Sequence, residues 1–247
     1  MKNFKIEIKV SPCKVNARSV ADNLITALNK SNPAVPLMER TEKILPGICE
    51  TVNEKTDPNE IYLIVEKMIS DRLKKDETHI SEKIKHFNAL ARNILSEAVE
   101  EITEIFSLKY KQPVEFRCFL GIYNPFPRSV LTKEYFLHYD ISDEVFLRAS
   151  LHEINHMIFF DKWKNMFGYE THKEPDFPDI LWFLEELIIE PTLNDSRIQN
   201  IVPIKHNAYD SFKKISIDGI PLTSYVQNLY DCRENIEDFI DTAYCFI

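Results

Sequence analysis

Residues 151–158 read LHEINHMI, and they contain the pattern His-Glu-x-x-His. His152 and His156 are four residues apart, so in a helix they lie one turn apart on the same face. Two imidazoles placed in this way can each offer a nitrogen to one Zn²⁺ ion, at about 2.0–2.1 Å. Glu153 can reach a water molecule on that ion, whose pKa the metal lowers towards about 7, and accept its proton. The spacing therefore predicts a zinc site that carries its own base.

The flanking residues predict the elements around this pattern. Ser142 and Asp143 both suit a helix N-cap, and an apolar-rich stretch follows as far as Trp163, so we expect one long helix over this range. Upstream, Val114–Leu120 has apolar residues at every second position, which predicts a strand. Glu134–Tyr139 is expected to form a second strand, at the edge of the sheet.

A catalytic zinc site needs a third protein ligand in addition to two histidines. The metzincin pattern is excluded, because Phe159 and Lys162 stand where it requires glycine and histidine. Peptide deformylases complete their site with an upstream cysteine. Cys118 is the one counterpart here, but it lies within the predicted strand and lacks the glycine-containing surroundings of that family.

A second helix offers better candidates for the third ligand. Residues 181–190 read LWFLEELIIE, so three acids interrupt an otherwise apolar segment. We expect this helix to run from about Pro178, since proline is acceptable in a first turn, to Glu190. Pro191 should then end or kink it, because proline cannot donate the helical hydrogen bond.

With this second helix, the chain resembles the gluzincin metallopeptidases, the thermolysin-like class. In that class a glutamate on a second helix completes the zinc site, and an acid four residues later supports a histidine ligand. The resemblance thus implies Glu186 as the third ligand and Glu190 as the support, although the family usually has aspartate at the second position. The "W-x-x-E" helix of related peptidases would select Glu185 instead. Glu186 is preferred, because it forms one polar stripe with Glu190 and Asn194.

The resemblance covers roughly residues 113–195 and implies the zincin-like fold. We therefore expect an α+β protein, mostly helical, with a small mixed sheet beside the His-Glu-x-x-His helix. In that fold the edge strand holds an extended substrate by main-chain pairing above the metal.

The implied activity is hydrolysis of a peptide bond with one Zn²⁺ per chain, so the expected partner is a peptide or protein substrate. Glu153 would deprotonate the zinc-bound water and later protonate the leaving amine. A tyrosine or histidine usually stabilises the oxyanion, and His206 and Tyr209 lie where the family places such groups, with Tyr225 in reserve. A non-catalytic zinc-binding interaction protein is the alternative, and Glu153 argues against it because a structural site has no use for a base.

Composition excludes several other classes. The chain has four glycines, which is too few and too scattered for a phosphate-binding loop. Its net charge of −9 argues against a nucleic-acid partner. We expect no membrane span, since no stretch approaches the roughly 20 apolar residues that one needs. Five scattered cysteines and the absence of an apolar leader favour a reducing cytoplasm.

Hydrophobic periodicity and the positions of prolines predict the elements in the rest of the chain. The N-terminal segment, residues 1–57, should contain a strand at Phe4–Val10, a short helix around Ser19–Asn29 and a mostly irregular, proline-bearing stretch to Asn59. Residues 58–247 are expected to form the zincin-like domain. It should begin with two amphipathic helices, near Glu60–Lys74 and Ile80–Phe106.

Overall fold

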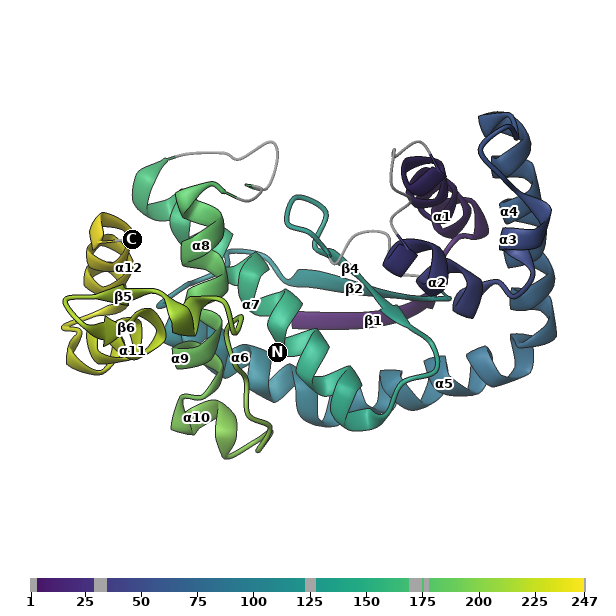
Figure 1. Cartoon of the computed structure of the whole chain (residues 1–247). Helices are drawn as coiled ribbons and strands as arrows, with labels where there is room; N and C mark the ends of the chain where they lie inside the picture. Colours follow the sequence, from purple (N-terminus) through teal and green to yellow (C-terminus); the bar gives the residue numbers. More distant parts are fainter. Residues whose placement is uncertain (1–3, 29–34, 123–127, 169–174, 176–177, 247) are drawn as a thin grey trace.

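The computed structural model describes residues 4–28, 35–122, 128–168, 175 and 178–246, and the structural statements below concern these residues. The protein is α+β and 64% helical, with a small mixed sheet, which confirms the expected fold class at this level. Helices lie at both ends of the sheet and along its lower side in Figure 1, and the C-terminal helices are at the end opposite to α1 (Cys13–Leu28) and α4 (Pro58–Lys75).

The sheet has four strands in the order β1-β2-β4-β3. Strands β1 and β2 are parallel, with Phe4 opposite Val114 and Val10 opposite Leu120, and β4 continues the parallel arrangement beyond β2. The short β3 runs antiparallel to β4. The strand bounds are as follows: β1 Phe4–Val10, β2 Val114–Gly121, β3 Arg128–Ser129 and β4 Glu134–His138.

Strand β4 departs from the expectation for residues 134–139. It forms as predicted, but it lies between β2 and β3 and is not the edge of the sheet. Arg128 pairs with Tyr135 and Ser129 pairs with Glu134 on its outer side. The two residues of β3 thus form the edge on this side.

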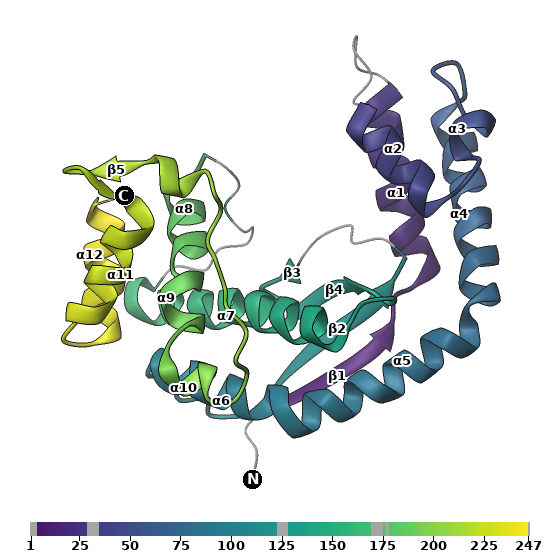
Figure 2. The same cartoon turned by 60° about the horizontal axis from the view of Figure 1, so that its bottom comes forward.

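One face of the sheet is buried and carries the core. Alternate side chains of β1, β2 and β4 are buried, among them Ile6, Phe116 and Tyr135, whereas their neighbours along each strand are exposed or half-buried. Helix α6 (Ser96–Ile105) packs on β1 and on α7, and α7 (Asp143–Phe167) packs on β4. These helices therefore form one layer against the apolar face, as Figure 2 shows for α7.

Helix α7 is the central element. Ser142 caps its N-terminus, where the side chain accepts a hydrogen bond from the backbone N–H of Val145 at 3.3 Å. Gly168, with φ of 66°, ends the helix in the left-handed conformation that glycine adopts without strain. The predicted helix is confirmed and extends four residues beyond Trp163. Fourteen of its side chains are buried, so the helix lies inside the protein.

The N-terminal segment is built into the same core. Helix α1 packs on α4, and β1 is a strand of the main sheet. The expected irregular stretch instead contains α2 and α3, with Pro36 at the second position of α2 and Pro58 at the first of α4. A first turn tolerates proline, because its N–H would have no helical partner there. A domain boundary at residue 57 stays a prediction.

The other helices agree broadly with their predicted positions. The segment predicted as one helix at 80–106 is continuous through a π-helical turn, Ala91–Leu95, between α5 and α6. Among the described helices, none combines the length and the apolar character that a bilayer crossing requires. The remaining bounds are α1 Cys13–Leu28, α2 Val35–Ile44, α3 Ile48–Thr51, α4 Pro58–Lys75, α5 Glu77–Leu90, α8 Ile180–Leu187, α9 Ile189–Leu193, α10 Ser196–Gln199, a 3-10 turn Phe212–Lys214, β5 Ser216–Ile217, β6 Ile220–Pro221, α11 Leu222–Cys232 and α12 Ile236–Phe246.

Candidate metal centre

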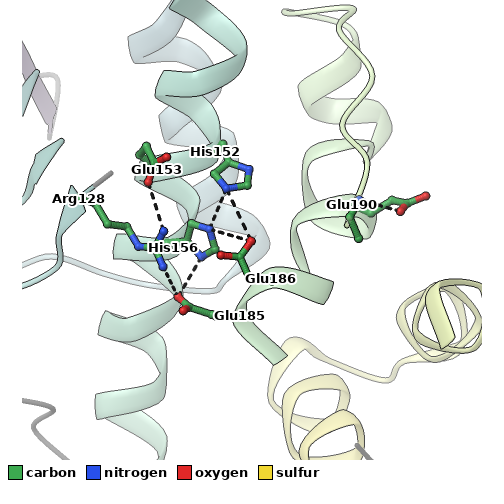
Figure 3. A network of polar contacts seen from close by, with 8 residues as sticks. Arg128, His152, Glu153, His156, Glu185, Glu186 and Glu190 are labelled. Atoms are coloured by element: carbon green, nitrogen blue, oxygen red, sulfur yellow. Dashed lines mark hydrogen bonds and ion pairs between the residues drawn. The ribbon is translucent and has the colours of Figure 1, made fainter. Parts of the chain in front are cut away.

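The two histidines of helix α7 converge on one point. The Nε2 atoms of His152 and His156 are 3.1 Å apart, and the two rings meet edge to face (Figure 3). His156 is fully buried and His152 is partly exposed. The helical spacing therefore does what the sequence predicted: it brings two imidazole nitrogens within reach of one ion.

Glu186 of helix α8 supplies a third donor atom. Its Oε2 lies 3.8 Å from Nε2 of His152 and 3.7 Å from Nε2 of His156. Among the described residues, these three form a group that could hold a metal ion, with donor atoms all within 4.8 Å of one another. Ligands about 2.0–2.1 Å from a tetrahedral zinc ion are separated by about 3.3 Å. The three donors need only small shifts to reach that geometry.

Both histidines are suited to metal binding because they stay neutral. Burial lowers the pKa of the His156 imidazole well below its ordinary value, and Arg128 adds to the shift. Burial is also the main cause for His152, followed by the neighbouring His156. A neutral imidazole keeps a lone pair for the ion, so no proton has to be displaced when a metal binds at neutral pH.

Glu185 precedes Glu186 but has a different environment, since neighbouring helical residues project about 100° apart. Its Oε2 lies 3.1 Å from Nδ1 of His156, on the side of the ring away from the other donors. This close contact falls short of hydrogen-bond geometry, and a small rotation of either group would complete it. Burial raises the pKa of Glu185 to about 7, and Arg128 opposes that shift. The structure thus places Glu186 in the cluster and Glu185 behind a histidine.

Arg128 is a member of the site that the sequence analysis missed. Its Nη2 lies 2.7 Å from Oε2 of Glu185, and its Nη1 lies 3.3 Å from Oε2 of Glu153. The Arg128 side chain is 7% exposed. It reaches the cluster from β3, and no local pattern around Arg128 marks it as different from any other arginine. Only the pairing of β3 with β4 brings it opposite α7 and α8.

Glu153 is buried beside the cluster and is not part of it. It projects from α7 towards Arg128, whereas its neighbour His152 faces Glu186 (Figure 3). Glu153 is thus beside the donor atoms but outside the group that could hold the ion, and its role as a general base stays a prediction.

Glu190 does not lie beside a histidine ligand. Its Oε2 accepts a hydrogen bond from the backbone N–H of Ala208 at 3.1 Å, and Figure 3 shows it apart from the cluster. The predicted helix breaks at Ile188, between α8 and α9, so the spacing from Glu186 to Glu190 does not follow one regular helix. The break agrees with the expected effect of Pro191, which cannot donate to the Leu187 carbonyl. Glu185 occupies the place beside His156 that was expected for Glu190.

The two expected oxyanion-stabilising residues follow the glutamate helix. Tyr209 is half exposed, stacks on Trp182 with ring centroids 5.8 Å apart, and lines a pocket of about 410 Å³ together with His152 and Glu186. Burial raises the Tyr209 pKa, and the Glu186 charge adds to the rise. The pocket gives the metal cluster an open side, as a catalytic site needs for substrate.

His206 is buried, and its Nε2 has no hydrogen-bond partner in the described structure. Its backbone N–H and carbonyl are both bound by the Asn194 side chain, which fixes the segment that precedes Tyr209. Burial lowers the pKa of His206 to about 4. This imidazole lies close enough to His152 to depress the pKa of that ligand in turn.

The other sequence candidates lie elsewhere. Cys118 is buried in β2, where burial raises the pKa of its thiol, and it is not one of the clustered donors. Tyr225, the reserve candidate, is in α11 and has its ring next to that of Phe246, at a centroid distance of 6.0 Å.

The chain matches no known family model, curated protein or solved structure. The chemistry of the site is therefore inferred from its own donor atoms. With all three carboxylates ionised, Glu153, Glu185 and Glu186 together with Arg128 carry a net charge of −2. Buried charge of this kind is costly unless it is compensated, and a divalent cation would neutralise it. Two neutral imidazoles and a carboxylate are also the donor set of several catalytic zinc sites.

Proposed function

We propose that this chain is a zinc-dependent metallopeptidase with a zincin-type site, holding one zinc ion through His152, His156 and Glu186. The observation that supports this most strongly is the convergence of three donor atoms from two helices, with Glu153 one residue from the first histidine. A structural site needs the donors alone. The buried acid and the open pocket beside them are features of a site that performs chemistry.

The zinc ion would supply Lewis-acid chemistry, by polarising the substrate carbonyl and making a water molecule more acidic. Glu153 would accept the proton of the attacking water and deliver it to the leaving amine. Its ion pair with Arg128 orients the carboxylate for this task. The Tyr209 hydroxyl group, at the rim of the pocket, would donate a hydrogen bond to the oxygen of the reacting carbonyl. His206 would form the wall behind His152.

The proposal is tested with zinc-loaded protein, a mixture of unlabelled peptides and mass-spectrometric detection of the products. Wild-type chain should contain about one zinc ion and cleave peptides. Glu153→Gln should lose about 10²- to 10⁴-fold in rate, the usual contribution of an acid–base group, while keeping its zinc. Equal turnover by this variant would remove Glu153 as the base, and metal-free wild-type protein would remove the zinc site.

One observation favours a second candidate function, a zinc-binding interaction protein without catalysis. The contact between Arg128 and Glu153 engages the carboxylate that catalysis requires. In that case wild-type protein binds zinc without cleaving any peptide, and Glu153→Gln leaves its binding of a partner protein unchanged. The same peptide mixture separates the two functions.

A further inference from the structure

Arg128 links the two acids that flank the candidate zinc ligands. One of its terminal nitrogens contacts Glu185, which lies behind His156, and the other contacts Glu153, which lies beside His152 (Figure 3). The guanidinium is nearly inaccessible to solvent, and the Glu185 side chain is fully buried. In such surroundings a charge-assisted hydrogen bond is stronger and better defined than on the surface.

The geometry points to Arg128 as a positioning residue, both for metal binding by His156 and for proton transfer by Glu153. This inference rests on the proposed function. Glu185, which Arg128 fixes, lies 3.1 Å from Nδ1 of His156 and would hold the ring with Nε2 towards the metal. Through its second contact, Arg128 holds Glu153 beside the reacting groups. The ion pairs of Arg128 described above run to these two acids, so we infer that it acts on the metal and the reacting groups through them.

The chemistry of the guanidinium explains why an arginine stands here. Its planar fork offers separate donors to two carboxylates, whereas a lysine ammonium is a single point of charge on a flexible stem. Carboxylates that orient a metal-bound histidine typically change metal affinity by about 10- to 100-fold when they are altered. An arginine that fixes such a carboxylate should have an effect of similar size.

The test measures zinc affinity by competition with a chelator in wild-type protein and in Arg128→Gln. The variant should bind zinc about 10- to 100-fold more weakly. With cobalt in place of zinc, its visible absorption should also change, because the histidine is less well oriented. At saturating zinc, kcat for peptide hydrolysis should fall while KM stays within about twofold. A variant with unchanged zinc affinity and an unchanged cobalt spectrum overturns the inference.

Arg117 gives a matched control. It lies on β2, which β4 separates from β3 in the same sheet, and it pairs with Glu134 at 3.0 Å, but its side chain is exposed enough for water to replace the contact. Arg117→Gln removes the same charge from the same sheet and should leave zinc affinity unchanged. An equal loss in both variants would indicate a general effect of charge, and Arg128 would then have no positioning role.

A double variant distinguishes positioning from simple destabilisation. If Arg128 acts on the metal through Glu185, Arg128→Gln should change zinc affinity by less than about threefold when Glu185→Gln is already present. Fully additive losses would overturn the route through Glu185. The double variant also removes a buried cation and a buried anion together, so it remains suitable where Arg128→Gln alone does not fold. Arg128→Lys should recover part of the affinity.

The zinc-binding measurements distinguish failure of the proposed function from failure of the inference about Arg128. Wild-type protein that takes up no zinc overturns the proposed function and this inference together. Wild-type protein that binds zinc tightly, with an equally tight Arg128→Gln variant, overturns this inference alone.

Discussion

Two sets of histidine–acid contacts in this molecule are similar in distance but differ in burial and in how many donor atoms converge. On the surface, His79 lies 3.3 Å from Asp140 and His86 lies 2.8 Å from Asp143, and all four side chains are about half exposed. In the candidate metal centre, His156 lies 3.1 Å from Glu185 and is fully buried. Distance alone would rank the pair formed by His86 first.

The difference shows what makes a group of polar side chains a site. Each surface pair joins one histidine to one acid, and water can replace either partner at little cost. In the candidate metal centre, two imidazole nitrogens and one carboxylate oxygen point at the same position, and His156 and Glu186 are buried. Convergence and burial, not the length of a contact, separate a metal centre from a surface ion pair.

The largest expected effect comes from removing a buried histidine of the candidate metal centre. His156→Asn should reduce the zinc content from about one ion per chain to a small fraction, because two donors do not retain zinc in competition with a chelator. His86→Asn makes the same substitution at a surface histidine and should leave zinc content unchanged. Elemental analysis after gel filtration in chelator measures both. Zinc retained by His156→Asn, or lost from both variants, would contradict the proposed ligand set.

A smaller effect should separate the two neighbouring acids of α8. Glu186→Gln removes a ligand, so the loss of zinc affinity should be greater than for Glu185→Gln, which we expect to cost about 10- to 100-fold. Both substitutions keep the size of the side chain and remove one charge, so each is the control for the other. Chelator competition measures the two affinities. The reverse ranking would make Glu185 the third ligand and assign the histidine contact to Glu186.

The smallest predicted effect concerns His206 and pH. Because its folded-state pKa is about 4 and that of an unfolded histidine is about 6.5, only the unfolded state gains this proton as the pH falls from 6.5. Metal-free protein should therefore lose about 2 kcal/mol of stability between pH 7 and pH 5 through this residue. His206→Gln should lose correspondingly less over that interval, whereas His86→Gln should behave as wild type. Urea unfolding at the two pH values measures the difference, and parallel losses in all three proteins would contradict it.

Local signals in the sequence were enough to predict the helix that carries the two histidines and two strands of the sheet beside it. The N-cap at Ser142 and the alternation in Phe4–Val10 and Val114–Leu120 are determined by residues close in the chain, and the structure confirms these three elements. The spacing of His152 and His156 likewise needs nothing beyond one helical turn.

Contacts between distant segments could not be predicted in this way. Arg128 joins the site because β3 pairs with β4, and the two residues of β3 carry no recognisable strand pattern. Glu190 is displaced because the helix breaks before it, and the register beyond such a break depends on the packing of α9. The stretch before Asn59 can contain helices because Pro36 and Pro58 fall in first turns and Pro46 lies in the turn between α2 and α3, positions that composition alone does not reveal.

The pairing of β1 with β2 affects when the sheet can fold during synthesis of the chain. Phe4 is opposite Val114, so β1 is made 110 residues before its partner strand. At about 5–20 residues per second, this delay lasts roughly 5–20 seconds, during which β1 has an apolar face and no sheet. Helices α5 and α6, which pack on β1 in the folded protein, are made before β2 and can cover this face first. The candidate metal ligands lie at positions 152–186, so the group that could hold an ion is complete only after both β1 and β2 have been made.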